Sequence, residues 1–194
     1  MLKIGIFALQ GDVSEHTKML HNVGKESGKD IKVAELRNFE IFDCDALIIP
    51  GGESTAMRKL THDEDGNKFL NFLKKISGEG IPVMGICAGL ILLAKNVNNK
   101  FYDGLLDIDV KRNGYGRQRE SFEADIVLNL GKITEKFHAI FIRAPVIEKV
   151  NRGEILANFE GKAVAVKDKN VMGITFHPEL TNYRKIYNYF LNLI

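Results

Sequence analysis

A cysteine placed between two glycines is the most informative feature of this sequence. Residues 82–93 read as an apolar strand that runs into Gly85-Ile86-Cys87-Ala88-Gly89 and then into an apolar helix. This is the form of a nucleophile elbow in which sulfur takes the place of the usual serine oxygen. The turn is so tight that a Cβ at position 85 or 89 is expected to clash. It presents the sulfur at the carboxyl end of the sheet, where open α/β folds bind ligands.

The predicted position of Cys87 also favours a reactive thiolate. A helix N-terminus offers positive potential and unpaired N–H groups, and the N–H of Ala88 points toward an oxyanion formed on attack. On this pentapeptide alone, a buried structural cysteine is an equally good interpretation. Cys44 provides a comparison within the chain, because Phe42-Asp43-Cys44-Asp45 has no flanking glycine and favours a structural role.

A cysteine nucleophile needs a proton acceptor that later returns a proton to the leaving group. Among the five histidines, only His177 directly follows an apolar strand and precedes a proline. Glu179 stands two residues further on and can hold the imidazole in one tautomer. Taken alone, His-Pro-Glu is better read as a turn that ends a strand. Together with the elbow about 90 residues upstream, it predicts a triad of Cys87, His177 and Glu179.

The other histidines suggest less. His16 lies on the first predicted helix, where a surface or interface position is an equally good interpretation, and His62 lies in a polar stretch. No pair of Cys or His has the spacing of metal ligands, so the sequence predicts no metal site.

A second glycine turn, Pro50-Gly51-Gly52-Glu53-Ser54-Thr55, also follows a buried strand. Successive glycines let the backbone approach a ligand and aim its N–H groups at it. We expect Gly52 to supply a second oxyanion donor beside Ala88. A phosphate-binding loop is the weaker alternative, since no Gly-Lys-Ser/Thr follows.

Arginines follow in two places. Arg112, Arg117 and Arg119 lie in a glycine-broken basic segment, for which a solvated loop is an equally good interpretation. Arg143 ends an apolar run just before Ala144-Pro145. An arginine at a strand end suits a substrate that carries a carboxylate, so a functional role is favoured for Arg143.

These residues need a scaffold of alternating strands and helices, which the first half of the chain provides. Strands are predicted over 2–9, 31–36, 45–49 and 82–86, and helices from Ser14 to about Lys25, from Glu53, over 67–76 and over 88–94. Ser14 is the expected cap of the first helix. This alternation is typical of βαβ units and a parallel sheet.

The second half of the chain reads as a series of short strands before a final aromatic helix. Some of these strands are expected to pair antiparallel at one edge of the sheet. The predicted strands are 106–111, 122–128, 138–142, 154–158, 162–167 and 171–176. The helix covers about 183–193, with Ile186, Tyr189, Phe190 and Leu193 on one face.

Composition excludes several classes of protein. The 194 residues carry a formal net charge of +2 and are 45% hydrophobic, so one globular domain over 1–194 is expected. The charge gives no reason to invoke nucleic acid or a membrane surface. Two cysteines cannot build a disulfide framework and indicate a reducing compartment, the cytoplasm. The first residues are too soon broken by polar residues for a signal peptide, and no apolar run reaches the roughly 20 residues of a membrane helix.

The triad motifs resemble those of class I, triad-type glutamine amidotransferases. Longer strings narrow the resemblance to the PdxT/SNO family, the glutaminase subunits of pyridoxal 5′-phosphate synthase, and it covers essentially the whole chain. The strings are LQGD with EH (9–12 and 15–16), PGGEST (50–55), GRQ with SFEAD (116–118 and 121–125), FIRAP (141–145) and FHPEL (176–180).

This resemblance implies a three-layer α/β fold, flavodoxin-like, with a mostly parallel sheet flanked by helices. It implies that Cys87 attacks the side-chain amide of glutamine, that His177 protonates the ammonia and then activates water, and that no cofactor is needed. The ammonia passes to a separate (β/α)₈ synthase subunit in a large hetero-oligomer, whose docking near the N-terminal strand and helix activates the glutaminase. The residues that match the family's glutamine-binding positions are Gly52, Glu53, Ser54, Arg112, Ile142 and Arg143.

Two other readings remain open at this stage. A stand-alone cysteine hydrolase of the same fold, such as a γ-glutamyl hydrolase, keeps the elbow but is expected to lack the FIRAP and GRQ strings. A non-catalytic binding partner is expected to have lost a triad residue, whereas all three are present.

Overall fold

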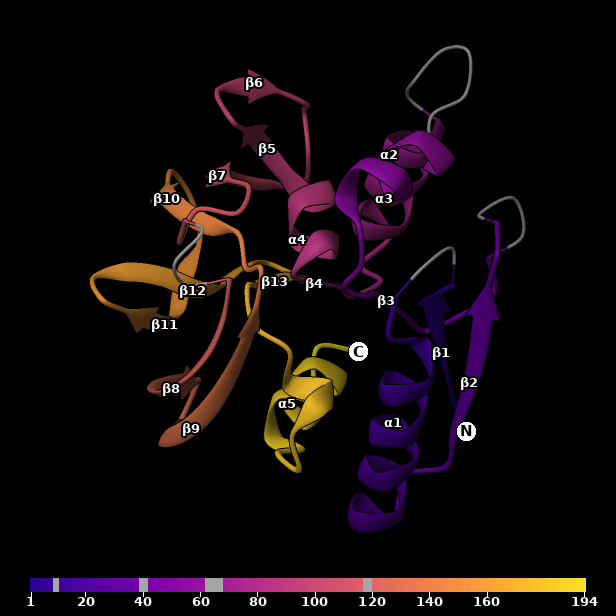
Figure 1. Cartoon of the computed structure of the whole chain (residues 1–194). Coiled ribbons are helices and arrows are strands. Elements are labelled where there is room, and N and C mark those ends of the chain that lie inside the picture. Colours follow the sequence, from indigo (N-terminus) through magenta and orange to yellow (C-terminus); the bar gives the residue numbers. More distant parts are fainter. Residues whose placement is uncertain (9–10, 39–41, 62–67, 117–119) are drawn as a thin grey trace.

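The fold is built on a nine-stranded sheet in the order β2-β1-β3-β4-β13-β12-β11-β8-β9 (Figure 1). The computed structural model describes residues 1–8, 11–38, 42–61, 68–116 and 120–194. The predictions made for residues 9–10, His62, Arg117 and Arg119 lie outside the described residues.

One half of the sheet is parallel, and it is the half that the apolar runs predict. Its inner strands β3, β4 and β13 are buried along their whole length, as expected where helices cover both faces. Its strands are β1 (Leu2–Phe7), β2 (Ile31–Leu36), β3 (Ala46–Ile49), β4 (Val83–Ile86) and β13 (Val171–Ile174).

Strands β4 and β13 matter most for the site. They pair in register and in the same direction, with Gly85 beside Gly173 and Ile86 beside Ile174. The segments that follow them therefore leave the sheet side by side, although they are far apart in the sequence.

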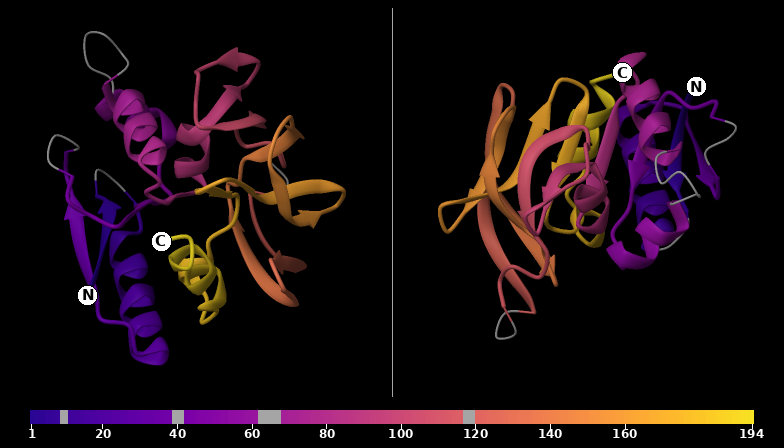
Figure 2. Two further views of the ribbon diagram at one scale, coloured as in Figure 1. Left: turned by 180° about the vertical axis from the view of Figure 1, so that it is seen from behind. Right: turned by 90° about the horizontal axis from the view of Figure 1, so that it is seen from above.

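The other half of the sheet is antiparallel, so the sheet as a whole is mixed. The expectation of a mostly parallel sheet applies only to the first half, and the antiparallel pairing expected at one edge is present. The β8–β9 hairpin lies at the far side of the molecule from β2 (Figure 2). The strands are β12 (Lys162–Asp168), β11 (Glu154–Phe159), β8 (Ser121–Leu130) and β9 (Ile133–Ile142).

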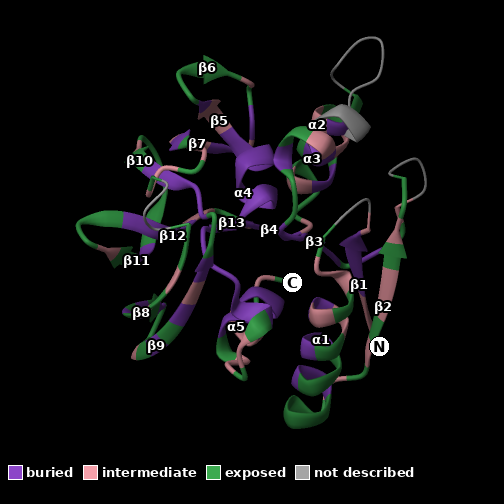
Figure 3. Ribbon diagram, viewed as in Figure 1, coloured by how far each residue is buried: buried purple, intermediate pink, exposed green. Residues whose placement is uncertain are grey.

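Helices cover both faces of the sheet and make two cores. On one face, α1 (Val13–Ser27) and α5 (Lys185–Leu191) pack against β1, β4 and the antiparallel strands. On the other face lie α2 (Ser54–Thr61), α3 (Lys68–Gly78) and α4 (Ala88–Leu93). Burial follows this layering, and α4 is buried throughout (Figure 3). The expected three layers are therefore present.

A second, four-stranded sheet in the order β10-β7-β5-β6 was not predicted. The predicted strand 106–111 is present as β7 (Leu106–Lys111), but it belongs to this sheet rather than to the main one. Ala94, expected to end a helix, instead begins β5. The strands that the sequence did not indicate are β5 (Ala94–Val97), β6 (Lys100–Phe101) and β10 (Val146–Val150).

Two helix predictions also need correction. Helix α1 begins at Val13 and Ser14 does not cap it, because the Ser14 hydroxyl instead donates to Glu15 at 2.7 Å. Helix α5 is shorter than predicted. Ile186 and Phe190 are buried as predicted, but Tyr187 and Leu191 complete the buried face, whereas Tyr189 and Leu193 are only partly buried. Among the described residues, no helix combines the length and the apolar character needed to cross a membrane.

Candidate active site

Cys87 occupies a strained turn between β4 and α4. Its backbone has φ 50° and ψ −101°, in a region that L-residues seldom adopt and that nucleophile elbows use. A Cβ on Gly85 would lie 2.7 Å from the carbonyl carbon of Gly89, and a Cβ on Gly89 would lie 2.1 Å from the carbonyl oxygen of Ile49. Both glycines are therefore required by backbone contacts, as the motif predicts.

The protein holds this turn from two sides. The backbone N–H of Cys87 donates to the carbonyl oxygen of Ile174 at 2.7 Å, which ties the turn to the end of β13. The sulfur lies 3.8 Å from the carbonyl oxygen of Ile142, at the end of β9, and only 7% of the residue is exposed. The thiol is thus held in place but still borders a pocket.

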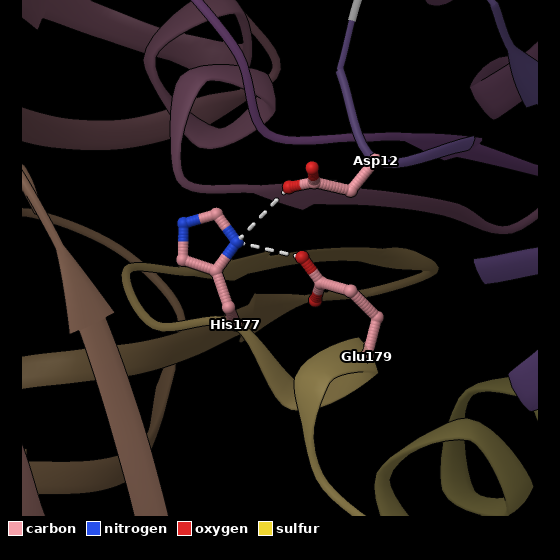
Figure 4. A group of neighbouring side chains, drawn as sticks. All are labelled: Asp12, His177 and Glu179. Atoms are coloured by element: carbon pink, nitrogen blue, oxygen red, sulfur yellow. Dashed lines mark hydrogen bonds and ion pairs between the residues drawn. The ribbon is translucent and has the colours of Figure 1, made fainter. Parts of the chain in front are cut away.

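His177 leaves the sheet just after β13, next to the elbow. Its backbone N–H donates to the carbonyl oxygen of Ile140 at 2.8 Å, which anchors the segment to β9. Its side-chain Nδ1 donates to Oε1 of Glu179 at 2.6 Å, and both residues are buried (Figure 4). Nε2 of His177 is not taken up by a carboxylate or a backbone group among the described residues, which leaves it free to interact with Cys87.

The surroundings of His177 favour its protonated form. Burial is the largest single influence and lowers its pKa, but hydrogen bonding and charge from Cys87 and Glu179 together outweigh it and raise the pKa to about 10. Such a histidine stabilises a neighbouring thiolate as an ion pair. It is also positioned by its carboxylate partner in one orientation, as the base of a triad is.

A second carboxylate stands close to this pair. Oδ2 of Asp12 lies 3.6 Å from Nδ1 of His177, on the side where Glu179 also approaches (Figure 4). The ligand atoms of Asp12, His177 and Glu179 lie within 4.8 Å of one another, which meets the distance requirement for a cation. His177 and Glu179 already bind each other through a short hydrogen bond, so we assign these two residues to the triad and Asp12 to the lining of the pocket beside them.

The elbow and His177 open into one pocket of about 410 Å³, a size that fits a small molecule. It brings together every residue that the sequence singled out for substrate or oxyanion binding. These are Gly52, Glu53, Ser54, Ala88, Arg112, Ile142 and Arg143. Asp12, Ile91 and Asn113 complete the lining and were not predicted.

Arg112 and Glu53 form the charged edge of this pocket. The Glu53 carboxylate accepts hydrogen bonds from the backbone N–H groups of Thr55 at 3.0 Å and Ala56 at 2.7 Å, so it caps α2. These bonds are the main reason that the pKa of Glu53 is lowered. The guanidinium of Arg112 donates to Glu53 at 3.1 Å and to the Thr55 hydroxyl at 2.8 Å. The Arg112 side chain is therefore held against the pocket rather than left in a solvated loop.

Gly51 has a role that the sequence did not reveal. A Cβ at this position would lie 2.6 Å from Cε1 of His177, so the Pro50-Gly51-Gly52 turn packs directly on the imidazole ring. Gly11 packs on Gly51 in turn, because a Cβ added at Gly11 would lie 1.8 Å from the Gly51 carbonyl oxygen. Two turns that end different parallel strands thus meet at His177.

His16 lies where the sequence gives no firm indication. A surface or interface position is an equally good interpretation of the sequence, but the structure buries the residue fully. Its Nδ1 shares a 2.7 Å hydrogen bond with the Tyr187 hydroxyl, and its Nε2 lies 3.8 Å from Oε1 of Glu179. The chain spacing of 171 residues between the first two partners explains why no local pattern indicates the contact.

Comparison with known proteins gives a consistent result. The model of the SNO glutamine amidotransferase family matches residues 6–194. Curated relatives named pyridoxal 5′-phosphate synthase subunit PdxT include one from Thermoplasma acidophilum, 44% identical over all of this chain and 93% of the relative. Another, from Archaeoglobus fulgidus, is 44% identical over 99% of this chain and 98% of the relative.

Solved structures point the same way. A crystal structure described as a glutamine amidotransferase matches with a TM-score of 0.84 and 38% identity, covering 98% of this chain and 97% of that one. The structure of PurLQS from Thermotoga maritima matches with a TM-score of 0.66 at 17% identity, over 99% of each chain. At that identity the second match concerns the fold alone.

Proposed function

This chain belongs to the SNO glutamine amidotransferase family, and from that premise we propose that it hydrolyses L-glutamine to L-glutamate and ammonia. We further propose that it supplies the ammonia to a synthase subunit that makes pyridoxal 5′-phosphate, as the names of its full-length relatives indicate. The observation that carries the proposal is the strained Cys87 elbow, which shares one pocket with His177, whose other ring nitrogen is bound to the buried Glu179.

The first half of the reaction forms a thioester. The Cys87 thiolate attacks the side-chain amide carbon of glutamine, so an S–C bond forms and the amide oxygen becomes an oxyanion. The Nε2–H of His177 gives its proton to the departing nitrogen as the C–N bond breaks, and ammonia leaves. Glu179 keeps the imidazole oriented and stabilises its positive charge before this transfer.

The second half releases glutamate. Neutral His177 takes a proton from water, and the resulting hydroxide attacks the thioester carbon. The C–S bond then breaks, which restores the Cys87 thiolate and the His177 imidazolium. The two halves sum to glutamine and water giving glutamate and ammonia, without a cofactor.

The remaining pocket residues are assigned by charge. We assign the backbone N–H groups of Ala88 and Gly52 to the oxyanion, since Ala88 begins α4 and both residues line the pocket. The guanidinium groups of Arg112 and Arg143 suit the α-carboxylate of glutamine, and the Glu53 carboxylate suits its α-ammonium. Ser54 and Ile142 complete the glutamine-binding set.

The partner and the setting are part of the same proposal. The synthase partner is a (β/α)₈ subunit within a large hetero-oligomer, and residues 1–194 act as one glutaminase domain. Cys44 and Cys87 are both free thiols, which fits a cytoplasmic protein.

The alternative of a stand-alone γ-glutamyl hydrolase is not favoured. The family match spans nearly the whole chain, and relatives identical at 44% carry the synthase-subunit name. A non-catalytic role is disfavoured because Cys87 and His177 line one pocket and His177 is hydrogen-bonded to the buried Glu179.

A glutaminase assay tests the proposal directly. The purified chain is mixed with its synthase subunit and glutamine, and glutamate and ammonia are measured. We expect Cys87→Ala to remove activity by about 10³-fold or more while the thermal unfolding midpoint stays near that of the wild type. Cys44→Ala is the matched control and should retain activity. Equal activity of the Cys87 and Cys44 variants would refute the mechanism.

The partner claim needs a separate measurement. The same assay run on the isolated chain should give low activity that rises when the synthase subunit is added. High activity that does not respond to the subunit would argue for the stand-alone hydrolase instead.

A further inference from the structure

A buried polar pair lies behind the triad, on the side away from the pocket. His16 comes from α1 and Tyr187 from α5, and both side chains are fully buried. Glu179 follows β13 in the short helix η2 (Pro178–Leu180), which packs against α1. Burying a histidine and a tyrosine in this core is costly unless their polar atoms interact. The reaction proposed above uses neither side chain.

The hydrogen bonds assign the proton on His16. Burial, and then the charge of Glu179, raise the pKa of Tyr187 well above its usual range, so its hydroxyl keeps its proton. Burial is also the main reason that the pKa of His16 is lowered, so its imidazole is neutral. If Nδ1 carried the proton, the Nε2 lone pair would face the Glu179 carboxylate and be repelled. We therefore assign the Tyr187 hydroxyl as donor to Nδ1 and place the His16 proton on Nε2.

With that proton, the N–H dipole of His16 points at the Glu179 carboxylate, which also accepts the hydrogen bond from His177. The 3.8 Å between Nε2 and Oε1 of Glu179 is longer than a hydrogen bond, so the contact is electrostatic. Nε2 of His16 and Oε2 of Glu179 have no hydrogen-bond partner among the described atoms. In a dry core such a dipole stabilises a negative charge strongly. The charged or titratable groups that act on His16 are Glu179, His177, Asp12 and Glu15.

We propose that His16 is a positioning residue of the active site, whose Nε2–H, set by the Tyr187 hydroxyl, holds the Glu179 carboxylate turned toward His177. This inference rests on the proposed glutaminase function and extends the triad by two residues from helices at opposite ends of the chain. Its effect reaches Cys87 in three steps. The dipole stabilises the Glu179 carboxylate, the carboxylate stabilises the His177 imidazolium, and the imidazolium stabilises the thiolate.

Two substitutions at position 16 separate this role from packing. Asn keeps a polar group near Nδ1 but has no donor that reaches Glu179, whereas the longer Gln places an amide N–H near the position of Nε2. We expect His16→Asn to lower kcat about tenfold, the size of effect that loss of a polar contact to a charged group produces. KM should change by less than about twofold, because His16 does not line the pocket. His16→Gln should recover most of the loss.

A second readout does not depend on turnover. In a Cys44→Ala background, the rate at which iodoacetamide alkylates Cys87 reports the thiolate fraction at each pH. His16→Asn should move the acid limb of this profile to higher pH by about half a unit, because a Glu179 carboxylate that is held less firmly stabilises the His177 imidazolium less, and the imidazolium then stabilises the thiolate less. Tyr187→Phe removes the hydroxyl that donates to Nδ1 of His16, so that His16 can also adopt its other tautomer. This substitution should move the acid limb in the same direction.

His21→Asn is the matched control, since it makes the same change at an exposed position of the same helix. It should leave both readouts unchanged. The proposal is overturned if folded His16→Asn keeps the wild-type kcat and alkylation profile, or if Asn and Gln are equally impaired. If His16→Asn does not fold, Tyr187→Phe decides by its alkylation profile alone. Failure of the wild type to release ammonia would instead refute the proposed function.

Discussion

Two histidines of this protein lie equally close to carboxylates, but they have opposite surroundings. His177 donates to Glu179 at 2.6 Å, and its side chain is only 4% exposed. His138, on β9, lies 2.7 Å from both Asp125 and Glu123 across the β8–β9 hairpin, and its side chain is 59% exposed. Nearly the same contact is therefore made once in the core and once in water.

The difference shows what turns an ion pair into an active site. Both pKa values are raised, that of His138 chiefly by its hydrogen bonds to Glu123 and then Asp125. Carboxylates occupy both ring nitrogens of His138, so neither is left to move a proton. His177 commits one nitrogen and keeps the other toward the pocket. Water and salt screen the exposed pair, whereas the buried pair retains its full electrostatic effect.

The largest expected effect comes from removing the charge of the buried carboxylate. Glu179→Gln keeps the shape of the side chain but loses the charge that orients and stabilises the His177 imidazolium. We expect kcat for glutamine hydrolysis to fall by about 10²–10⁴-fold, as when a triad loses its carboxylate. Steady-state assays with the synthase subunit present measure this change.

The exposed pair supplies the matched control. Glu123→Gln makes the same substitution beside His138 and should leave kcat within about twofold of the wild type. A comparable loss in both variants would show that the two pairs do not differ as argued.

The next effect is on stability and depends on pH. A histidine whose pKa is higher in the folded state stabilises the fold below its unfolded pKa, and that contribution is lost as pH rises toward the folded value. For His177 this window runs from about 6.5 to about 10. The free energy of unfolding of the wild type should therefore fall, relative to His177→Asn, by about 2–4 kcal/mol across that window. Urea unfolding at several pH values measures it, and parallel curves would contradict it.

Part of the fold and of the active site could be predicted from the sequence alone. The parallel strands were predictable because burial on both faces produces continuous apolar runs, as in β4 and β13. Cys87 and His177 were predictable because each follows directly on such a strand. Their shared pocket then follows from two neighbouring parallel strands, whose carboxyl ends must meet at one edge of the sheet.

What sequence could not reveal depends on contacts between distant elements. β5 and β6 are short and only half apolar, and they are strands only because they pair with β7 or with each other. His16 and Tyr187 have no local signature either, since their hydrogen bond joins opposite ends of the chain. The buried face of α5, which places Tyr187 inside, depends on packing against α1 and the sheet.

A smaller effect should come from the backbone contact that His177 has and His138 lacks. Gly51→Ala adds a Cβ 2.6 Å from Cε1 of His177, which must push the ring away from its 2.6 Å bond to Glu179. We expect kcat to fall by about 10–100-fold, since small displacements of catalytic groups are costly. Gly78→Ala, where nothing lies within 4 Å, is the control and should leave kcat unchanged. Similar kcat values for the two variants would contradict this role of Gly51.

The smallest effect concerns salt and tests the difference in solvent exposure itself. Raising ionic strength from about 0.1 M to about 1 M shortens the screening length from roughly 10 Å to roughly 3 Å. The pKa of exposed His138 should then fall toward its ordinary value of 6.5, because its stabilisation by Glu123 and Asp125 is screened. The pKa of His177 should change little, because water and ions do not enter between it and Glu179.

NMR titration of the imidazole C–H signals measures both histidines in one sample at each salt concentration. His177→Asn and His138→Asn assign the two signals. Equal shifts of both pKa values would mean that His177 is accessible to ions in solution, and the buried pair would then have no electrostatic advantage over the exposed one. A shift confined to His138 would instead show that burial shields the contact between His177 and Glu179 from salt, so that this contact keeps the pKa of His177 raised although burial itself lowers it.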